Sequence, residues 1–351
     1  MERPGLLGLG LGLAAAGAAV GAVLERGVVR PRLRGSRVDE PGPPFGGVRG
    51  PARVVLADDG VELYVEVDES SPLAPPHDVT VVYSHGFSLN LDSWHYQRLA
   101  MQGVVRSVYW DQRGHGRSGR GAPEANTVDQ LGADLRAVIE ATTPTGRLVV
   151  VGHSMGGMTI MALADRYPEL FGDRVVGVGL LSTSAGRMAE VTFGIPAAAA
   201  RGLSRAAPGV LGQLGRRPDL VELGRRTGSD LEFLLTRRLS FASPVSAAKV
   251  DFVRQMIAAT PVDTLAELFP VLNAHDKFAA LEVLNGVETL VMVGESDLLT
   301  PPDHSREIAR LVPGAELVVL PECGHLIQLE YPDRVDAELN GLLHRATRSH
   351  A

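Results

Sequence analysis

The sequence predicts an α/β fold, with a mostly parallel sheet of about eight strands and helices on both faces. Three observations predict it. Short runs of Val, Leu and Ile alternate with amphipathic stretches, two early runs form a hairpin, and a long segment without β-branched runs separates two groups of strands. Buried strands that alternate with helices are typical of a parallel sheet covered on both sides.

The first elements are a hairpin followed by buried strands. RVVLA (53–57) and VELYVEV (61–67) flank an Asp-Asp-Gly turn, and the second run alternates as a half-buried strand does. DVTVVYS (78–84) and SVYWDQ (107–112) are continuous apolar runs, which indicates strands buried on both faces. Residues 128–142 place apolar side chains at helical spacing.

The alternation continues to the end of the chain, with one interruption. The later strands are expected at 147–151, 175–181, 289–293 and 316–320, and the helices from about 155, near 303–312 and through Val335, Leu339, Leu342 and Leu343. The interruption, about 187–285, is rich in Ala, Leu and Arg and is interpreted as several short helices. Over 187–270 it holds eleven Lys and Arg against eight Asp and Glu. A solvated helical surface accounts for that excess, and attraction to an anionic membrane is the alternative.

Composition excludes several classes of protein. Of the 351 residues 45% are hydrophobic, which is enough to fill a core and excludes a disordered chain. The net charge of −7 gives no indication of a nucleic-acid partner. Cys323 is the only cysteine, so an intramolecular disulfide, a Cys-based zinc cluster and an iron–sulfur site are excluded.

The N-terminal region is expected to anchor the protein in a membrane. Residues 5–24 carry no charge, and a helix of twenty residues at about 1.5 Å each would span the hydrocarbon core. A cleavable signal peptide and a helix packed on the protein itself are the alternatives. The arginines that follow, within residues 1–37, place the catalytic side in the cytoplasm by the positive-inside rule. Residues 38–52 are interpreted as a Pro/Gly linker and 53–348 as the folded domain.

The candidate nucleophile is a serine on a turn between a strand and a helix. Gly152-His153-Ser154-Met155-Gly156 matches G-x-S-x-G, follows an apolar strand directly and opens a helix. Such a turn holds the serine in strained backbone geometry with its hydroxyl exposed. The helix that follows directs free N–H groups towards an oxyanion that forms beside the serine.

Chain order selects the partners of this serine, because a serine hydroxyl needs a base that a third group orients. In this architecture the order is serine, acid and histidine, each after a strand. Asp297 follows the strand at 289–293 and His325 follows the strand at 316–320. Glu295 is the rival acid, but it lies nearer the end of its strand.

Two other histidines, His85 and His153, directly flank the expected site. Each lies in a loop beside a Gly or Ser, where structural hydrogen bonding is the expected role. The strand at 175–181 is followed by STSAGR, which has no carboxylate, so the alternative position for the acid is empty.

Five motifs in order resemble those of a known family. They are SHGF (84–87), DQRGHGRS (111–118), GHSMGG (152–157), GESDLLTP (294–301) and GHLIQLE (324–330). Together they resemble the α/β-hydrolase superfamily, in its serine-triad esterase and lipase branch, over about 53–348. The resemblance implies that the backbone N–H groups of Phe87 and Met155 form the oxyanion hole, and that the insert at 187–285 is the family's helical cap.

This reading predicts a serine hydrolase that cleaves a carboxylic ester through an acyl-enzyme, with no cofactor or metal. Phe87, Met155 and the Ala/Leu-rich insert favour an uncharged, aliphatic, small-molecule or lipid-like acyl ester. The same triad serves thioesterases, C–C hydrolases and cofactor-free haloperoxidase-like enzymes, and these remain alternatives, as does a non-catalytic binding protein. The sequence leaves the oligomeric state open.

Overall fold

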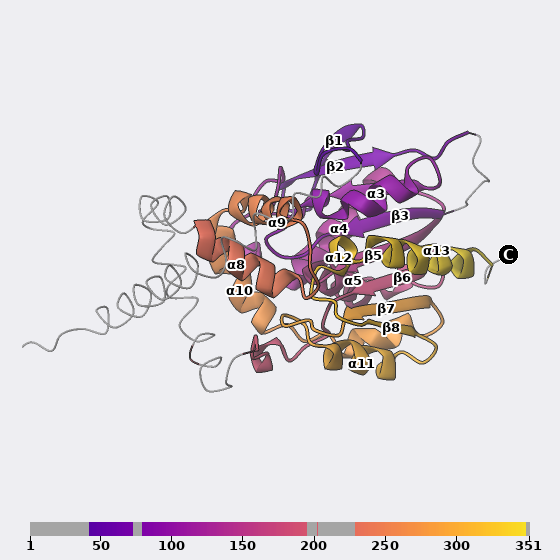
Figure 1. The fold of residues 1–351 in the computed structure, drawn as a ribbon. Coiled ribbons are helices and arrows are strands. Elements are labelled where there is room, and N and C mark those ends of the chain that lie inside the picture. Colours follow the sequence, from indigo (N-terminus) through magenta and orange to yellow (C-terminus); the bar gives the residue numbers. More distant parts are fainter. Residues whose placement is uncertain (1–41, 73–78, 195–201, 203–228, 349–351) are drawn as a thin grey trace, which may run out of the picture.

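The computed structural model describes residues 42–72, 79–194, 202 and 229–348. Its centre is an eight-stranded sheet in the order β1-β2-β4-β3-β5-β6-β7-β8, which confirms the predicted fold class (Figure 1). β2 is antiparallel to both of its neighbours, and the six strands from β3 to β8 are parallel. The strands are β1 (Ala52–Leu56), β2 (Glu62–Asp68), β3 (Val79–Ser84), β4 (Arg106–Trp110), β5 (Arg147–His153), β6 (Val175–Leu181), β7 (Glu288–Gly294) and β8 (Glu316–Leu320).

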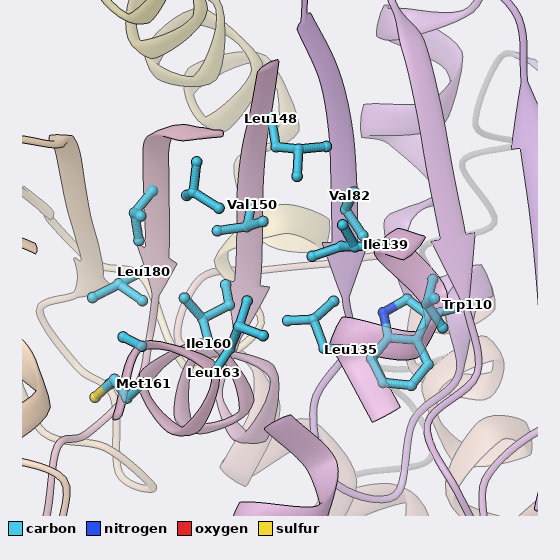
Figure 2. Packing of buried hydrophobic residues seen from close by; sticks show 14 of the residues in the cluster. Val82, Trp110, Leu135, Ile139, Leu148, Val150, Ile160, Met161, Leu163 and Leu180 are labelled. Atoms are coloured by element: carbon cyan, nitrogen blue, oxygen red, sulfur yellow. The ribbon is translucent and has the colours of Figure 1, made fainter. Parts of the chain in front are cut away.

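Helices cover both faces of this sheet. One face is covered by α4 (Val128–Thr142), α5 (Met155–Arg166) and α11 (Pro302–Leu311), the other by α3 (His95–Met101), α12 (Ile327–Glu330) and α13 (Pro332–Arg348). Successive residues of a strand point to opposite faces, so Val82 and Val150 pack against the first group of helices and Val81 and Val149 against the second. Figure 2 shows the first core, where Leu135 and Ile160 meet the strands.

The described part of the insert is helical and lies over the carboxyl ends of the strands. It contains α8 (Ser229–Ser240), α9 (Ala247–Ala259) and α10 (Val262–Asn273), between β6 and β7 (Figure 1). The amide of Leu326, after β8, donates to the carbonyl of Ser240 at 3.0 Å. Arg120, after β4, pairs with Asp263 and Glu267 of α10. Residues 195–201 and 203–228 of the insert lie outside the described residues.

The structure differs from the expected linker at 38–52, whose residues from 42 onward are described. Phe45 stacks on Phe252 of α9, with ring centroids 4.8 Å apart. Arg49 pairs with Asp92, and the Gly50 amide donates to Glu66 at 3.0 Å. Proline and glycine content indicated a linker, but it could not show that one aromatic ring and one guanidinium find partners on the domain.

The expected membrane segment, residues 5–24, lies outside the described residues. Within the part of the chain that the structure describes, no helix is long and apolar enough to cross a membrane.

Candidate active site

Ser154 lies on a sharp turn between β5 and α5. Its backbone has φ 53° and ψ −118°, a left-handed conformation that costs energy for a residue with a Cβ atom. Glycine is required at two neighbouring positions. A Cβ atom at Gly152 would lie 2.4 Å from the Gly156 carbonyl carbon, and one at Gly156 would lie 2.0 Å from the Ser84 oxygen. The Ser154 side chain is partly exposed in this turn, as a nucleophile must be.

His325 and Asp297 come together beside this turn. The His325 Nδ1 atom lies 2.8 Å from Asp297 Oδ2 and 3.0 Å from Oδ1, and both side chains are buried. Asp297 also accepts hydrogen bonds from the amides of Leu299 and Thr300, at 2.8 and 2.9 Å, and from the Thr300 hydroxyl at 2.9 Å. These donors hold the carboxylate so that it accepts the proton on Nδ1, which leaves Nε2 of His325 able to act as a base.

Glu295, the rival acid, has a different environment. Its side chain is exposed, two residues before Asp297, and the carboxylate that lies within hydrogen-bond distance of His325 Nδ1 is that of Asp297. Because an orienting carboxylate must touch the imidazole, the geometry favours Asp297 over Glu295 for that role.

His153 connects the serine turn to the loop of His325. Its Nε2 atom lies 3.0 Å from the His325 carbonyl oxygen, and the two rings are 4.8 Å apart. Complete burial holds the pKa of His153 well below its usual range, so the ring is neutral and its Nε2–H donates to that carbonyl. His153 therefore has the structural hydrogen bond expected for it, and its acceptor is the backbone carbonyl of His325, the candidate base.

The expected oxyanion-hole residues come from the start of α5 and from the loop after β3. Met155 is the first residue of α5, so its amide has no acceptor within the helix. The loop that carries Phe87 passes close to the serine, since a Cβ atom at Gly86 would lie 3.2 Å from the Ser154 Cβ atom. The next amide along, that of Ser88, donates to His115 Nε2 at 3.1 Å. Burial lowers the pKa of His115 to about 4, which keeps its ring a neutral acceptor.

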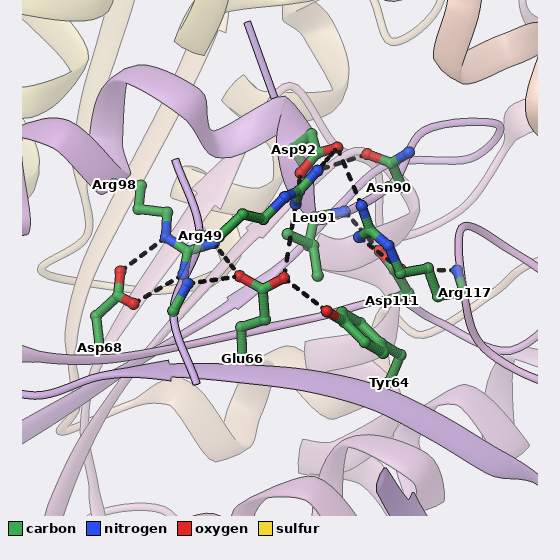
Figure 3. A network of polar contacts seen from close by, with 11 residues as sticks. Arg49, Tyr64, Glu66, Asp68, Asn90, Leu91, Asp92, Arg98, Asp111 and Arg117 are labelled. Carbon is green, nitrogen blue, oxygen red and sulfur yellow. Dashed lines mark hydrogen bonds and ion pairs between the residues drawn. The ribbon is translucent and has the colours of Figure 1, made fainter. Parts of the chain in front are cut away.

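A buried network of polar contacts holds the loop after β3, which carries Phe87, in place (Figure 3). Asp111 accepts the amides of Leu91 and Arg117, at 2.8 and 2.9 Å, and so ties the loop after β3 to the loop after β4. Burial raises the pKa of Asp111 to about 6. The carboxylates of Glu66 and Asp68 are held by Arg98 in the same network.

Two supporting residues were not singled out from the sequence. Gln112 donates through its amide nitrogen to the His85 carbonyl, and its backbone N–H donates to His85 Nε2 at 2.9 Å. The Thr159 hydroxyl of α5 donates to Gln112 Oε1 at 2.7 Å. Gln112 lies within the motif 111–118, but no periodicity or charge pattern distinguishes a buried glutamine that joins two loops from one on the surface.

No metal site is evident near these residues. Within the described ranges, no three His, Cys, Asp or Glu side chains are grouped so that they could hold a metal ion. Cys323 is buried and has a free thiol, whose pKa burial raises.

Comparisons with known proteins bear on the fold of the chain. The family model described as alpha/beta hydrolase fold matches residues 79–332. A monoacylglycerol lipase of Mycolicibacterium smegmatis is 32% identical over 157 residues, which cover 43% of this chain and 52% of that protein. The dihydrolipoyllysine-residue acetyltransferase component of the acetoin cleaving system of Pseudomonas putida is 28% identical over 76% of this chain, and the match spans 63% of its length.

A similar structure has also been solved. A thermophilic esterase from Thermogutta terrifontis superposes with a TM-score of 0.67 at 24% identity, and the match covers 85% of this chain and all of that one. At this identity the likeness shows the fold alone.

Proposed function

The chain belongs to the alpha/beta hydrolase family, and within that family we propose that it is a serine esterase that acts through an acyl-enzyme on Ser154. The observation that carries the proposal is the buried hydrogen bond between His325 Nδ1 and Asp297, beside a strained turn that presents Ser154. A nucleophile, a base and an orienting acid are the three parts that acyl transfer to serine requires.

The proposed reaction has two halves. His325 Nε2 accepts the proton of the Ser154 hydroxyl as its oxygen attacks the ester carbonyl, and the Phe87 and Met155 amides stabilise the oxyanion. His325 then protonates the alcohol as it leaves, and the acyl group remains on Ser154. In the second half His325 activates a water that attacks the acyl-enzyme, which releases the carboxylic acid and restores the serine.

We propose an ester with an aliphatic acyl group as the substrate class. Met155 follows the serine directly and packs with Met158 and Leu268 in one buried apolar cluster, against which the partly buried Phe87 also packs. Among the relatives, a protein named monoacylglycerol lipase and one named rhodomycin D methylesterase have names that denote ester cleavage.

A fluorophosphonate probe tests the nucleophile. The wild-type protein should be labelled covalently, and Ser154→Ala should not. A panel of p-nitrophenyl esters of increasing chain length then tests the reaction class. If the wild-type protein is labelled but hydrolyses no ester of the panel, another acyl-transfer or serine-triad chemistry replaces the esterase proposal. Equal labelling of both proteins would reject Ser154 itself.

We further propose that residues 5–24 attach the protein to a membrane, with the catalytic domain on the cytoplasmic side. The support is the run of twenty uncharged residues followed by arginines.

A further inference from the structure

A concave surface lies beside the loop after β7 that carries Asp297, here called the acid loop. It is a groove of about 510 Å³ between α8 and the loop after β7. Its lining consists of Leu234, Arg237, Arg238, Phe241, Ala242, Ser296 and Leu298. Neither Ser154 nor His325 belongs to this lining, whereas Ser296 and Leu298 are the two sequence neighbours of Asp297.

The groove contains two arginines without counter-ions among the described residues. Arg237 is half-buried and Arg238 is exposed, and neither forms an ion pair in the part of the chain that the structure describes. Other arginines of the domain differ, since Arg98 and Arg113 each have a carboxylate partner. Because no carboxylate among the described residues pairs with these guanidinium groups, their N–H donors are available to a bound carboxylate, which accepts charge-assisted hydrogen bonds from arginine.

Apolar side chains accompany these charges. Leu234 lies one turn before the arginines in α8, and Phe241, the first residue after the helix, follows them by three to four residues, so the four residues have the spacing i, i+3, i+4 and i+7. Leu298 faces them from the acid loop, close to Gly194 and Arg238. A ligand that fits must therefore combine an anionic head with an apolar stem, and a groove of this volume falls in the range of small-molecule sites.

From this combination we propose that the groove between α8 and the acid loop binds an aliphatic carboxylate, with its head on Arg237 and Arg238. The carboxylate has two possible sources. It is either the far end of the substrate or its acyl product, in which case the inference rests on the proposed esterase function, or a separate effector. In both cases the ligand touches Ser296 and Leu298, the two residues that flank Asp297.

Calorimetric titration with octanoate tests the site without requiring turnover. The wild-type protein should bind octanoate at least about tenfold more tightly than octanamide, since a carboxylate accepts stronger, charge-assisted hydrogen bonds from guanidinium groups than a neutral amide does. The double variant R237Q/R238Q should lose that preference and keep its affinity for octanamide. R306Q/R310Q is the matched control, because these arginines pair with acids on the surface of α11, and it should behave as wild type. Equal affinity of the wild-type protein for octanoate and octanamide, or an unchanged preference in R237Q/R238Q, overturns the proposal.

Inhibition of p-nitrophenyl acetate hydrolysis by octanoate identifies the source. If octanoate inhibits competitively and the R237Q/R238Q variant is inhibited less, the carboxylate belongs to the substrate or product. If octanoate inhibits non-competitively or activates, and this effect is weaker in R237Q/R238Q, the carboxylate belongs to an effector. If the protein binds octanoate but hydrolyses no ester, the esterase proposal fails and the carboxylate site stands. If the protein hydrolyses esters but binds octanoate no more tightly than octanamide, the esterase proposal stands and the proposed carboxylate site fails.

Discussion

The histidines around Ser154 differ in role because they differ in partner. His325 has a carboxylate on Nδ1, which leaves its other nitrogen available for proton transfer. His85, His115 and His153 are buried against backbone groups, and burial lowers the pKa of each. Chain order predicted His325 because acid and base positions follow particular strands. It could not predict that His153 donates to the His325 carbonyl, since that contact joins residues 172 positions apart.

Replacing the acid should separate Asp297 from Glu295. Asp297→Asn should lower kcat by roughly 10⁴-fold, as in serine proteases whose orienting acid becomes an amide, because the imidazole then takes the wrong tautomer. Glu295→Gln, two residues away and exposed, is the matched control and should remain near wild type. Steady-state kinetics on a short p-nitrophenyl ester measure both. The opposite ranking would assign the acid to Glu295.

A second prediction concerns His153 as a positioning residue. His153→Leu removes the donor to the His325 carbonyl, and an unpaired buried acceptor costs about 1–3 kcal/mol. We therefore expect kcat to fall by about tenfold to hundredfold with little change in KM. His153→Gln, which can return an N–H donor towards that carbonyl, should recover most of the loss.

The pH profile of kcat/KM distinguishes positioning from a general loss of structure. A displaced His325 loop should change the hydrogen bond to Asp297 and with it the pH dependence of kcat/KM, whereas a merely destabilised protein retains the wild-type profile. If the Leu and Gln variants have equal kcat, packing rather than the hydrogen bond positions His325.

At the scale of elements, strand–helix alternation predicted the sheet and the Ser154 turn. Apolar runs mark buried strands directly, and the glycines around Ser154 mark a turn in which side chains would collide. The packing of α4 on α5 was not predictable from the sequence. By helix propensity alone, Gly132 in the middle of α4 is only an unfavourable residue, and nothing in the sequence shows that another helix lies against it. In the structure it is the point at which α4 approaches the backbone of α5.

Two glycine substitutions test this close approach. A Cβ atom at Gly132 would lie 2.8 Å from backbone atoms of Ala162 and Leu163, so Gly132→Ala should destabilise the protein by about 1–3 kcal/mol despite the better helix propensity of alanine. Gly341→Ala in α13 is the control. There the new methyl group would meet only the flexible end of Arg345, at 3.3 Å, and the change should be neutral or stabilise by up to about 1 kcal/mol. Urea unfolding monitored by circular dichroism measures both. If Gly132→Ala leaves the free energy of unfolding unchanged, as Gly341→Ala should, α4 and α5 can separate at no cost and the prediction is wrong.

At the scale of the whole molecule, the boundary of the folded domain differs from the sequence-based expectation. The domain was expected to start at 53, yet Phe45, Arg49 and Gly50 already have partners on α9, the loop after β3 and β2. Composition describes a segment by itself, whereas a domain boundary depends on surfaces that the rest of the chain supplies. The folded unit therefore extends at least to Phe45.

The last prediction uses this boundary to test the proposed membrane attachment. A protein that begins at Gly42 keeps the stack of Phe45 on Phe252 and the Arg49–Asp92 pair, and it lacks residues 5–24. It should remain in the supernatant and hydrolyse a short ester as fast as the full-length protein, because Phe87, Ser154 and the other proposed site residues all lie later in the chain. The full-length protein should sediment with membranes, since twenty uncharged residues expose a large apolar surface in water.

A protein that begins at Arg53 is the control for the boundary. It loses those same contacts and the Gly50–Glu66 hydrogen bond, so its unfolding midpoint in urea should fall below that of the protein that begins at Gly42. If the protein that begins at Gly42 aggregates or is inactive, residues 5–24 act as a helix packed on the domain. If Edman sequencing of the mature protein starts near residue 20, the segment is a cleaved signal peptide, and the cytoplasmic placement is rejected with the anchor.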